Sequence, residues 1–298
     1  MEQFLDPLVL ARVKDMPLVA KTVAQGFLHG LHNSVKRGTG IEFSQYRAYE
    51  PGDALSNIDW KLFARSDRYF VREAERESNI NIWLVLDASA SMLQQASHSN
   101  EGWNKFDYAR HLLATIAYIA HQQGDGLGLL GLSSKNLHFL PALPGKQQWQ
   151  KCLLQLSDMQ AGDVFPDSTI IQNYLAKMHD NAVIFVVSDF YEHNKEIFDF
   201  MTSLSSHKTE IVALQLESND EVTFPYQGHI RFEDRETKQQ ILVSAKDVRA
   251  DYLKTREAFN ENLSEHLAAN NIQHIQGNID EPLDKTLHQF LSARQNML

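Results

Sequence analysis

The chain has 298 residues, 43% of them hydrophobic and 22% charged, which is the composition of an ordinary globular protein with enough apolar residues for a core. The formal net charge of −10 does not supply the positive surface that nucleic-acid binding requires. No apolar run approaches the length of a membrane helix and the first residues do not resemble a secretory signal, so we expect no membrane insertion. Cys152 is the single cysteine, and the resulting lack of an internal disulfide favours a reducing, cytoplasmic location.

The amino-terminal part of the sequence predicts a small α+β elaboration. Apolar residues at roughly helical spacing predict helices within residues 1–35, and we expect Pro17 to divide them. Strand-like stretches follow at residues 41–49 and 68–75. We assign residues 1–77 to this elaboration of helices and short strands.

The pattern then changes to one typical of an α/β domain, which we assign to residues 78–298. Continuous apolar runs predict strands covered on both faces, at residues 80–87, 126–133, 183–188 and 209–217. Amphipathic patterns predict helices at residues 104–122, 146–157, 169–178 and 194–206. Asn104 stands where an N-cap belongs. Strands alternating with helices predict a mainly parallel sheet with helices on both faces.

The carboxyl-terminal part is expected to extend the same domain. A polar turn flanked by two strand-like halves predicts a hairpin within residues 229–244. A long polar helix at about 247–270, a short strand at 271–277 and a final helix follow, and we expect this helix and strand to join the sheet.

Polar residues cluster at the expected carboxyl ends of the buried strands, where open parallel sheets bind their ligands. The first strand leads into Asp87, Ser89 and Ser91, whose two-residue spacing allows one tight loop to turn all three side chains to one point. The third strand leads into Asp189, and Thr169 opens an intervening helix. Oxygen ligands of this kind suit a hard divalent cation, which we expect to be Mg²⁺, with Mn²⁺ and Ca²⁺ as alternatives.

A simpler explanation is that these side chains cap helices, because Ser and Asp are preferred N-caps. For either strand end alone, capping accounts for the residues as well as a cation does. Two such ends at one edge of one sheet favour the cation site. Whether Thr169 contributes stays open at this point.

The loop, the helix-opening Thr169 and the later Asp189 resemble the metal-ion-dependent adhesion site of von Willebrand factor A domains. In that family the loop and the Thr supply direct or near-direct ligands, the later Asp usually acts through water, and one position stays open for an acidic side chain of a partner. The family usually has glycines before its Thr, whereas this chain has Asp167 and Ser168, so Ser168 is an alternative to Thr169. The resemblance implies a von Willebrand factor A-like, Rossmann-like fold and the metal ligands Asp87, Ser89, Ser91, Thr169 and Asp189.

Residues 37–76 contain a second pattern, formed by Gly38, Gly40, Phe43, Arg47, Tyr49, Pro51, Gly52, Asp53, Ile58, Asp59, Trp60, Ala64 and Arg65. These positions resemble the uncharacterised bacterial family called domain of unknown function fifty-eight, and the resemblance extends over essentially the whole chain. That family is associated with MoxR-type AAA+ ATPases, which implies a partner of this kind and a chaperone-like role in assembly or maturation. The alternating charges of the segment also favour a purely structural ion-pair network.

Enzymatic motifs are largely missing from the sequence. A haloacid-dehalogenase-type phosphatase needs a second Asp at position 89, where this chain has Ser89. The chain has neither a G-x-S-x-G elbow nor a phosphate-binding glycine loop. We therefore expect a non-enzymatic protein-binding module without catalytic residues. The alternative is a metal-dependent phosphoesterase that uses the same cation as a Lewis acid.

Overall fold

The computed structural model describes the larger part of the chain. The described residues are 16–17, 19–21, 23–24, 46–48, 70–72, 80–97, 103–134, 137–162, 164–166, 168–175, 177–178, 181–191, 196–204 and 209–295.

The chain divides into two compact units, residues 1–28 with 80–298 and residues 29–79. In the smaller unit, β1 (Tyr46–Ala48) pairs antiparallel with β2 (Phe70–Arg72), and each strand lies within a stretch that the sequence predicted as extended. The expected boundary at residues 77 and 78 lies outside the described residues and stays a prediction. In the larger unit Met16 and Pro17 are both helical, but the residues before them lie outside the described part, so the expected division at Pro17 stays a prediction.

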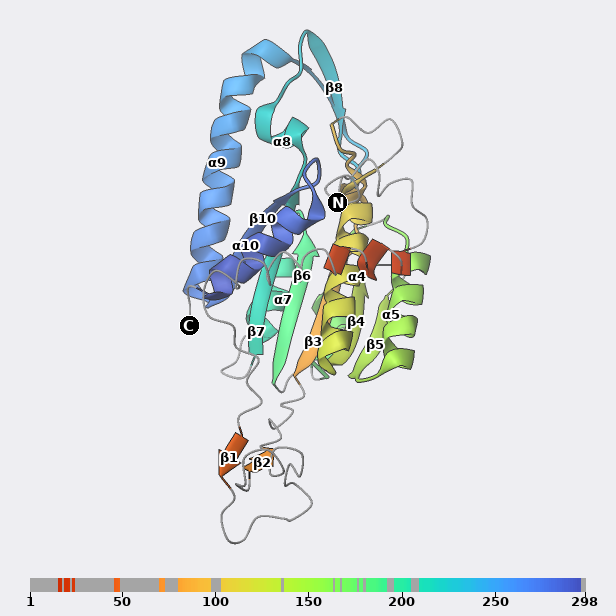
Figure 1. Ribbon diagram of the computed structural model, residues 1–298. Coiled ribbons are helices and arrows are strands. Elements are labelled where there is room, and N and C mark those ends of the chain that lie inside the picture. The colour runs from red at the N-terminus through yellow and green to blue at the C-terminus, as the bar shows by residue number, and fades with distance from the viewer. Residues whose placement is uncertain are drawn as a thin grey trace. The chain divides into compact units, whose positions relative to one another are not determined.

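The larger unit is built on one six-stranded sheet (Figure 1). The strand order is β10-β7-β6-β3-β4-β5, and all neighbours are parallel except β4 and β5. Counted along the chain this is the doubly wound order 3-2-1-4-5-6, which reverses between β3 and β6. The strands are β3 (Asn81–Asp87), β4 (Gly126–Leu132), β5 (His138–Leu143), β6 (Ala182–Ser188), β7 (Thr209–Glu217) and β10 (Ile272–Asn278).

The sequence-based prediction of these strands is confirmed. The four apolar runs form β3, β4, β6 and β7, which are adjacent and parallel. The tail strand β10 extends the sheet by pairing with β7, as expected. The runs are continuously apolar because helices cover both faces of the sheet, so successive side chains are buried alternately on either side.

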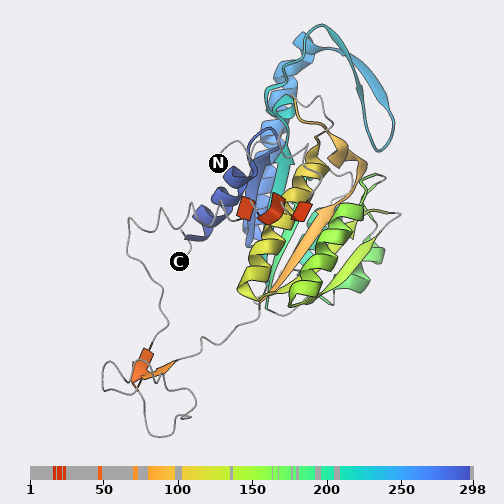
Figure 2. The ribbon, with the colours of Figure 1, turned by 45° about the vertical axis from the view of Figure 1, so that its right-hand side comes forward.

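Helices α4 (Lys105–Gln123), α5 (Lys146–Asp158) and α10 (Leu283–Gln295) lie on one face of the sheet, and α6 (Ser168–Leu175), α7 (Glu196–Leu204) and α9 (Ala245–Ala269) lie on the other (Figures 1 and 2). The hydroxyls of Tyr108 in α4 and Thr286 in α10 form a hydrogen bond of 2.9 Å, which connects two helices of the first layer. Asn104 caps α4 as predicted, because its Oδ1 accepts from the amide of Asp107 at 2.8 Å.

The hydrophobic core lies between the sheet and these helices. On the second face, side chains of β3, β6 and β7 pack with those of α6, α7 and the end of α9. Trp83 is the largest side chain of this core and is fully buried. Gly128 on the neighbouring strand makes room for its indole, because a Cβ there would lie 2.5 Å from the Trp83 ring.

A separate hairpin extends beyond the carboxyl edge of the sheet (Figures 1 and 2). It consists of β8 (His229–Glu233) and β9 (Gln240–Ser244), which pair antiparallel as predicted. The short helix α8 (Asn219–Thr223) precedes the hairpin, and α9 follows it. Among the helices that the structure describes, none has the length and apolar character needed to cross a membrane.

Candidate metal centre

Asp87 and Asp189 lie side by side at the carboxyl edge of the sheet. Asp87 is the last residue of β3 and Asp189 directly follows β6, and these two strands are paired in parallel. Both side chains are buried, with Asp87 2% and Asp189 1% exposed. The strand order reverses between β3 and β6, so the two carboxylates occupy the position where doubly wound sheets bind ligands.

The two serines of the loop join these carboxylates. The Ser89 amide donates to Asp87 Oδ1 at 2.9 Å, and the Ser89 and Ser91 hydroxyls lie 2.9 Å apart. Ser91 Oγ donates to Asp189 Oδ1 at 3.3 Å. Four of the five predicted site residues therefore form one cluster.

The loop continues into the short 3-10 helix η3 (Ala90–Leu93), which tests the capping explanation directly. Ser89 occupies the N-cap position but its side chain makes no capping hydrogen bond. Its hydroxyl contacts Ser91 instead. Helix capping therefore does not account for the hydroxyl of Ser89.

The donor set fits a small hard cation. Every polar side-chain atom of the four clustered residues is an oxygen, the ligand type that Mg²⁺ prefers. Adjacent ligands of an octahedral Mg²⁺ at about 2.1 Å lie about 3.0 Å apart, and the Ser89 and Ser91 hydroxyls are separated by a similar 2.9 Å. In the described part of the chain no three His, Cys, Asp or Glu side chains gather to hold a metal, so the site depends on hydroxyls as well as on carboxylates.

Asp87 is costly to ionise in this environment. Burial, and secondly the charge of Asp189, raise the pKa of Asp87 to about 7, although hydrogen bonds from Ser188 and Ser89 act in the opposite direction. Ser188 Oγ donates to Asp87 Oδ2 at 2.6 Å and accepts from the amide of Phe190 at 2.9 Å. Phe190 has a φ of 60°, an unusual value for a residue with a side chain, and such strain concentrates at functional sites.

The sequence did not identify Lys105 as part of the site. Its Nζ lies 3.1 Å from Asp189 Oδ2 and 2.7 Å from Glu221 Oε1, and its side chain is fully buried. Burial alone lowers the pKa of Lys105, but Asp189 and Glu221 outweigh it, so the pKa is raised and the side chain is an ammonium. The position of Lys105 at the start of the predicted helix was a usable signal. A cation there is unfavourable with the helix dipole, which indicates that acidic side chains lie nearby.

Glu221 is held in place by α8. It forms a capping box with Ser218, whose amide and hydroxyl both donate to Glu221 Oε2. The other carboxylate oxygen is left for Lys105. The chain of contacts from Asp189 through Lys105 to Glu221 thus connects the cluster to the next element along the edge.

The segment that leads toward the second predicted loop contacts the first loop at Gly162. Gly162 N donates to the carbonyl oxygen of Ala88 at 2.9 Å, so the segment before α6 passes beside the first loop. Helix α6 begins at Ser168, one residue before the expected Thr169. The side chains of Ser168 and Thr169 lie outside the described part, so the choice between them stays open.

The amino-terminal motif falls almost wholly outside the described residues. Of its matching positions the structure describes only the backbone of Arg47, in β1. Its expected ion-pair network therefore stays a prediction.

The sheet order, the two helical layers and the polar cluster at the switch point define a von Willebrand factor A-like α/β protein. Residues 45–266 match the family described as "Protein of unknown function DUF58", and the chain belongs to this family.

Two bacterial relatives similar in sequence carry the names of uncharacterized proteins. An uncharacterized protein of Mycobacterium tuberculosis is 26% identical over 235 residues, which cover 78% of this chain and 72% of that protein. The uncharacterized protein YeaD of Bacillus subtilis is 25% identical over 150 residues, 50% of this chain and 33% of that protein.

Solved structures show similarity at lower identity. The conserved hypothetical protein BatB from Bacteroides thetaiotaomicron is 12% identical with a TM-score of 0.46, over 72% of this chain and 99% of that one. The VWA domain of SpRpn10 is 12% identical with a TM-score of 0.40, over 70% and 94%.

Proposed function

We propose that this protein is a non-enzymatic module that binds a partner protein through a bound divalent cation, with Mg²⁺ as the first candidate. The observation that carries the proposal is the convergence of Asp87, Ser89, Ser91 and Asp189 at the switch point. The raised pKa of Asp87 supports it, because a carboxylate that is costly to ionise gains most from a nearby cation.

The contacts suggest a division of roles within the site. Asp87, Ser89 and Ser91 would hold the cation directly, with Thr169 or its alternative Ser168 as the fourth ligand. Asp189 already meets Ser91 with one oxygen and Lys105 with the other, which suits a role through water. Since Lys105 balances Asp189, the cation would keep much of its charge and attract a carboxylate of the partner to an open position.

The partner class comes from the family resemblance rather than from the geometry of the site. We propose a MoxR-type AAA+ ATPase, served by this protein in a chaperone-like assembly or maturation step. The cation would then make the contact switchable, because its removal leaves the partner carboxylate facing Asp87.

The test is capture of the ATPase from native lysate by the immobilised chain, in Mg²⁺ and in EDTA. Wild type and a control variant, Asp158→Ala on the exposed end of α5, should recover the ATPase in Mg²⁺ only. Asp87→Ala should recover at least tenfold less, because it loses the charged ligand. Equal recovery in EDTA, or by Asp87→Ala, would contradict the proposal.

A second measurement on the same proteins tests the phosphoesterase alternative. We expect no Mg²⁺-dependent hydrolysis of p-nitrophenyl phosphate or its bis-ester by wild type. Turnover that Asp87→Ala abolishes would replace the binding function with the enzymatic one.

A further inference from the structure

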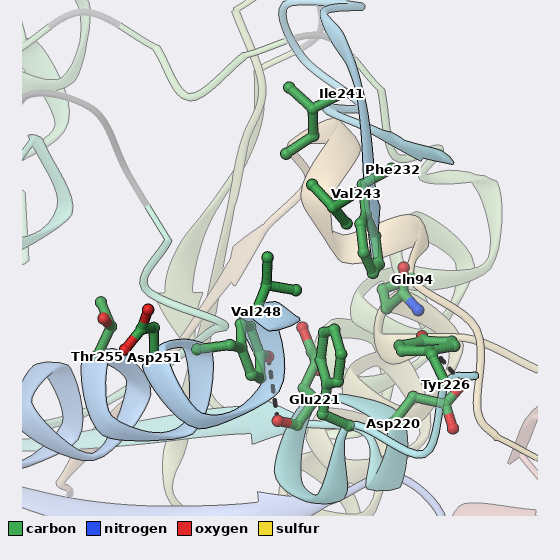
Figure 3. Close-up of a pocket in the computed structure, with 12 residues that line it drawn as sticks. Gln94, Asp220, Glu221, Tyr226, Phe232, Ile241, Val243, Val248, Asp251 and Thr255 are labelled. Carbon is green, nitrogen blue, oxygen red and sulfur yellow. Dashed lines mark hydrogen bonds between the residues drawn. The ribbon is translucent and has the colours of Figure 1, made fainter. Parts of the chain in front are cut away.

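A pocket of about 590 Å³ lies next to the candidate metal centre, between α8, α9 and the hairpin (Figure 3). Its walls are mainly apolar and aromatic. Phe224 contacts Phe232 of the hairpin and Tyr252 of α9, with ring centroids 5.9 and 4.8 Å apart. Tyr252 also donates a hydrogen bond to the carbonyl oxygen of Glu221 at 3.0 Å. These contacts hold the three elements around the pocket.

The hairpin contributes one of its two faces to the pocket. Phe232 pairs with Ile241 in the antiparallel register, so their side chains share a face, and Val243 follows two residues later on the same face. All three line the pocket. Ile241 remains 60% exposed at the mouth, which leaves apolar surface to be covered. Leu242 is 67% exposed but belongs to the opposite face, with Arg231.

The polar part of the lining is acidic. Asp220, Glu221 and Asp251 line the pocket, and none of its described lining residues is Lys, Arg or His. Glu221 is paired with Lys105, but Asp220 and Asp251 add negative charge. The negative charge also acts on Tyr226 in the lining. Burial, followed by the charge of Asp220, raises the pKa of Tyr226 to about 12.

The pocket shares a wall with the metal-binding loop. Gln94, which lines the pocket, follows η3, and its amide donates to the carbonyl oxygen of Ser91 at 3.0 Å. The carbonyl oxygen of Gln94 accepts from the amide of Lys105, also at 3.0 Å. The pocket therefore adjoins the loop that carries Ser91.

We propose that this pocket docks a segment of a partner protein in which a large apolar side chain adjoins a lysine or arginine. The volume lies in the range of about 300–1,000 Å³ that is typical of binding pockets. An apolar side chain would cover Ile241, Val243 and Phe232, and the adjacent cation would face Asp220 and Asp251. No step of this docking requires a metal ion, so it is independent of the proposed function of the Asp87 site.

The test uses a phage-displayed library of random twelve-residue peptides, selected on the full chain in EDTA. We expect enrichment of peptides that place Lys or Arg beside Phe, Trp, Leu or Ile. Acidic peptides, or no enrichment, would overturn the proposal.

The most enriched peptide is then synthesised and its binding measured by fluorescence anisotropy. Ile241→Gln should weaken binding about tenfold, since loss of one apolar contact is worth roughly 1.5 kcal/mol. Leu242→Gln is the matched control on the other face and should bind like wild type. We expect the two variants to have the same melting temperature. This result would show that the weaker binding of Ile241→Gln does not come from a damaged hairpin.

Charge is tested with a second matched pair on α9. Asp251→Lys should weaken the same peptide about tenfold and reduce the salt dependence of binding, whereas Asp247→Lys, which does not line the pocket, should change it little. Equal effects of the two substitutions would mean that overall charge, not the pocket, attracts the peptide. Because all binding is measured in EDTA, failure here leaves the proposed cation-dependent function intact, and failure of Mg²⁺-dependent capture leaves this proposal intact.

Discussion

Two strands of the sheet end in buried carboxylates at the same edge, and the partners of these carboxylates differ in charge. At the end of β7, Glu217 accepts from Arg256 Nη2 at 2.6 Å, so α9 supplies a positive partner. At the end of β3, Asp87 accepts from the Ser89 amide and the Ser188 hydroxyl, and no described cationic side chain pairs with it. The two residues are buried to a similar degree, with Glu217 5% and Asp87 2% exposed. Burial alone therefore does not distinguish them.

The difference separates the carboxylate that is paired within the fold from the one that we propose as a cation ligand. Buried charges in proteins are normally paired or bound to a metal ion. Glu217 is paired within the fold, and Asp189 is paired with Lys105. Asp87 has only neutral donors among the described residues, and burial, followed by the charge of Asp189, raises its pKa to about 7 in spite of them. A bound cation would give Asp87 what Arg256 gives Glu217.

The largest effect is expected from removing the ammonium between Asp189 and Glu221. Lys105→Met should destabilise the protein by about 3–5 kcal/mol, because two acidic groups lose a buried cation. Urea denaturation measures this change. The control is Lys285→Met, which breaks an exposed pair with Glu281 and should change the stability by less than about 1 kcal/mol. Similar losses for the two variants would show that Lys105 is not integral to the site.

The next largest effect is expected from neutralising Asp87, and its sign depends on pH. Asp87 has a pKa of about 7 when folded and metal-free, against an ordinary value of 3.8. The folded state therefore retains the proton between these values, and stability falls as the pH rises from about 4 to about 7. Asp87→Asn does not titrate, so in EDTA at pH 8 it should be more stable than wild type by up to roughly 4 kcal/mol.

Thermal unfolding between pH 4 and pH 8 checks this prediction. Mg²⁺ should raise the melting temperature of wild type at pH 8 and leave that of Asp87→Asn unchanged. Parallel pH profiles for the two proteins in EDTA would contradict the assignment of the raised pKa to Asp87.

The smallest effect is expected at the structural half of the edge. Arg256→Met should destabilise the protein by about 1–3 kcal/mol, because Glu217 keeps its hydrogen bond from Asn260 at 3.3 Å. Mg²⁺ affinity, measured by calorimetry, should not change, since Glu217 is not part of the cluster. A loss of Mg²⁺ binding in this variant would extend the metal centre to β7 and blur the distinction between the two halves.

The second loop shows where prediction from sequence reached its limit. The Asp-x-Ser-x-Ser loop is local, so the positions of Ser89 and Ser91 relative to Asp87 could be predicted from two-residue spacing after a buried strand. Thr169 lies about 80 residues from that loop, and its approach depends on the path of residues 159–167. Nothing in the sequence of that segment distinguishes Thr169 from Ser168.

The sequence by itself determined the parallel strands of the sheet, most helices and the edge at which Asp87 and Asp189 meet. Buried strands and amphipathic helices leave a periodic apolar pattern, and parallel strands bring their carboxyl ends to one edge. Only the tertiary structure decided the charge balance of that edge, because Lys105, Asp189 and Glu221 come from three separate elements. The pocket depends on tertiary structure in the same way, since the hairpin face, α8 and α9 form it only after they pack together. Such contacts have no periodicity along the chain, so no local pattern encodes them.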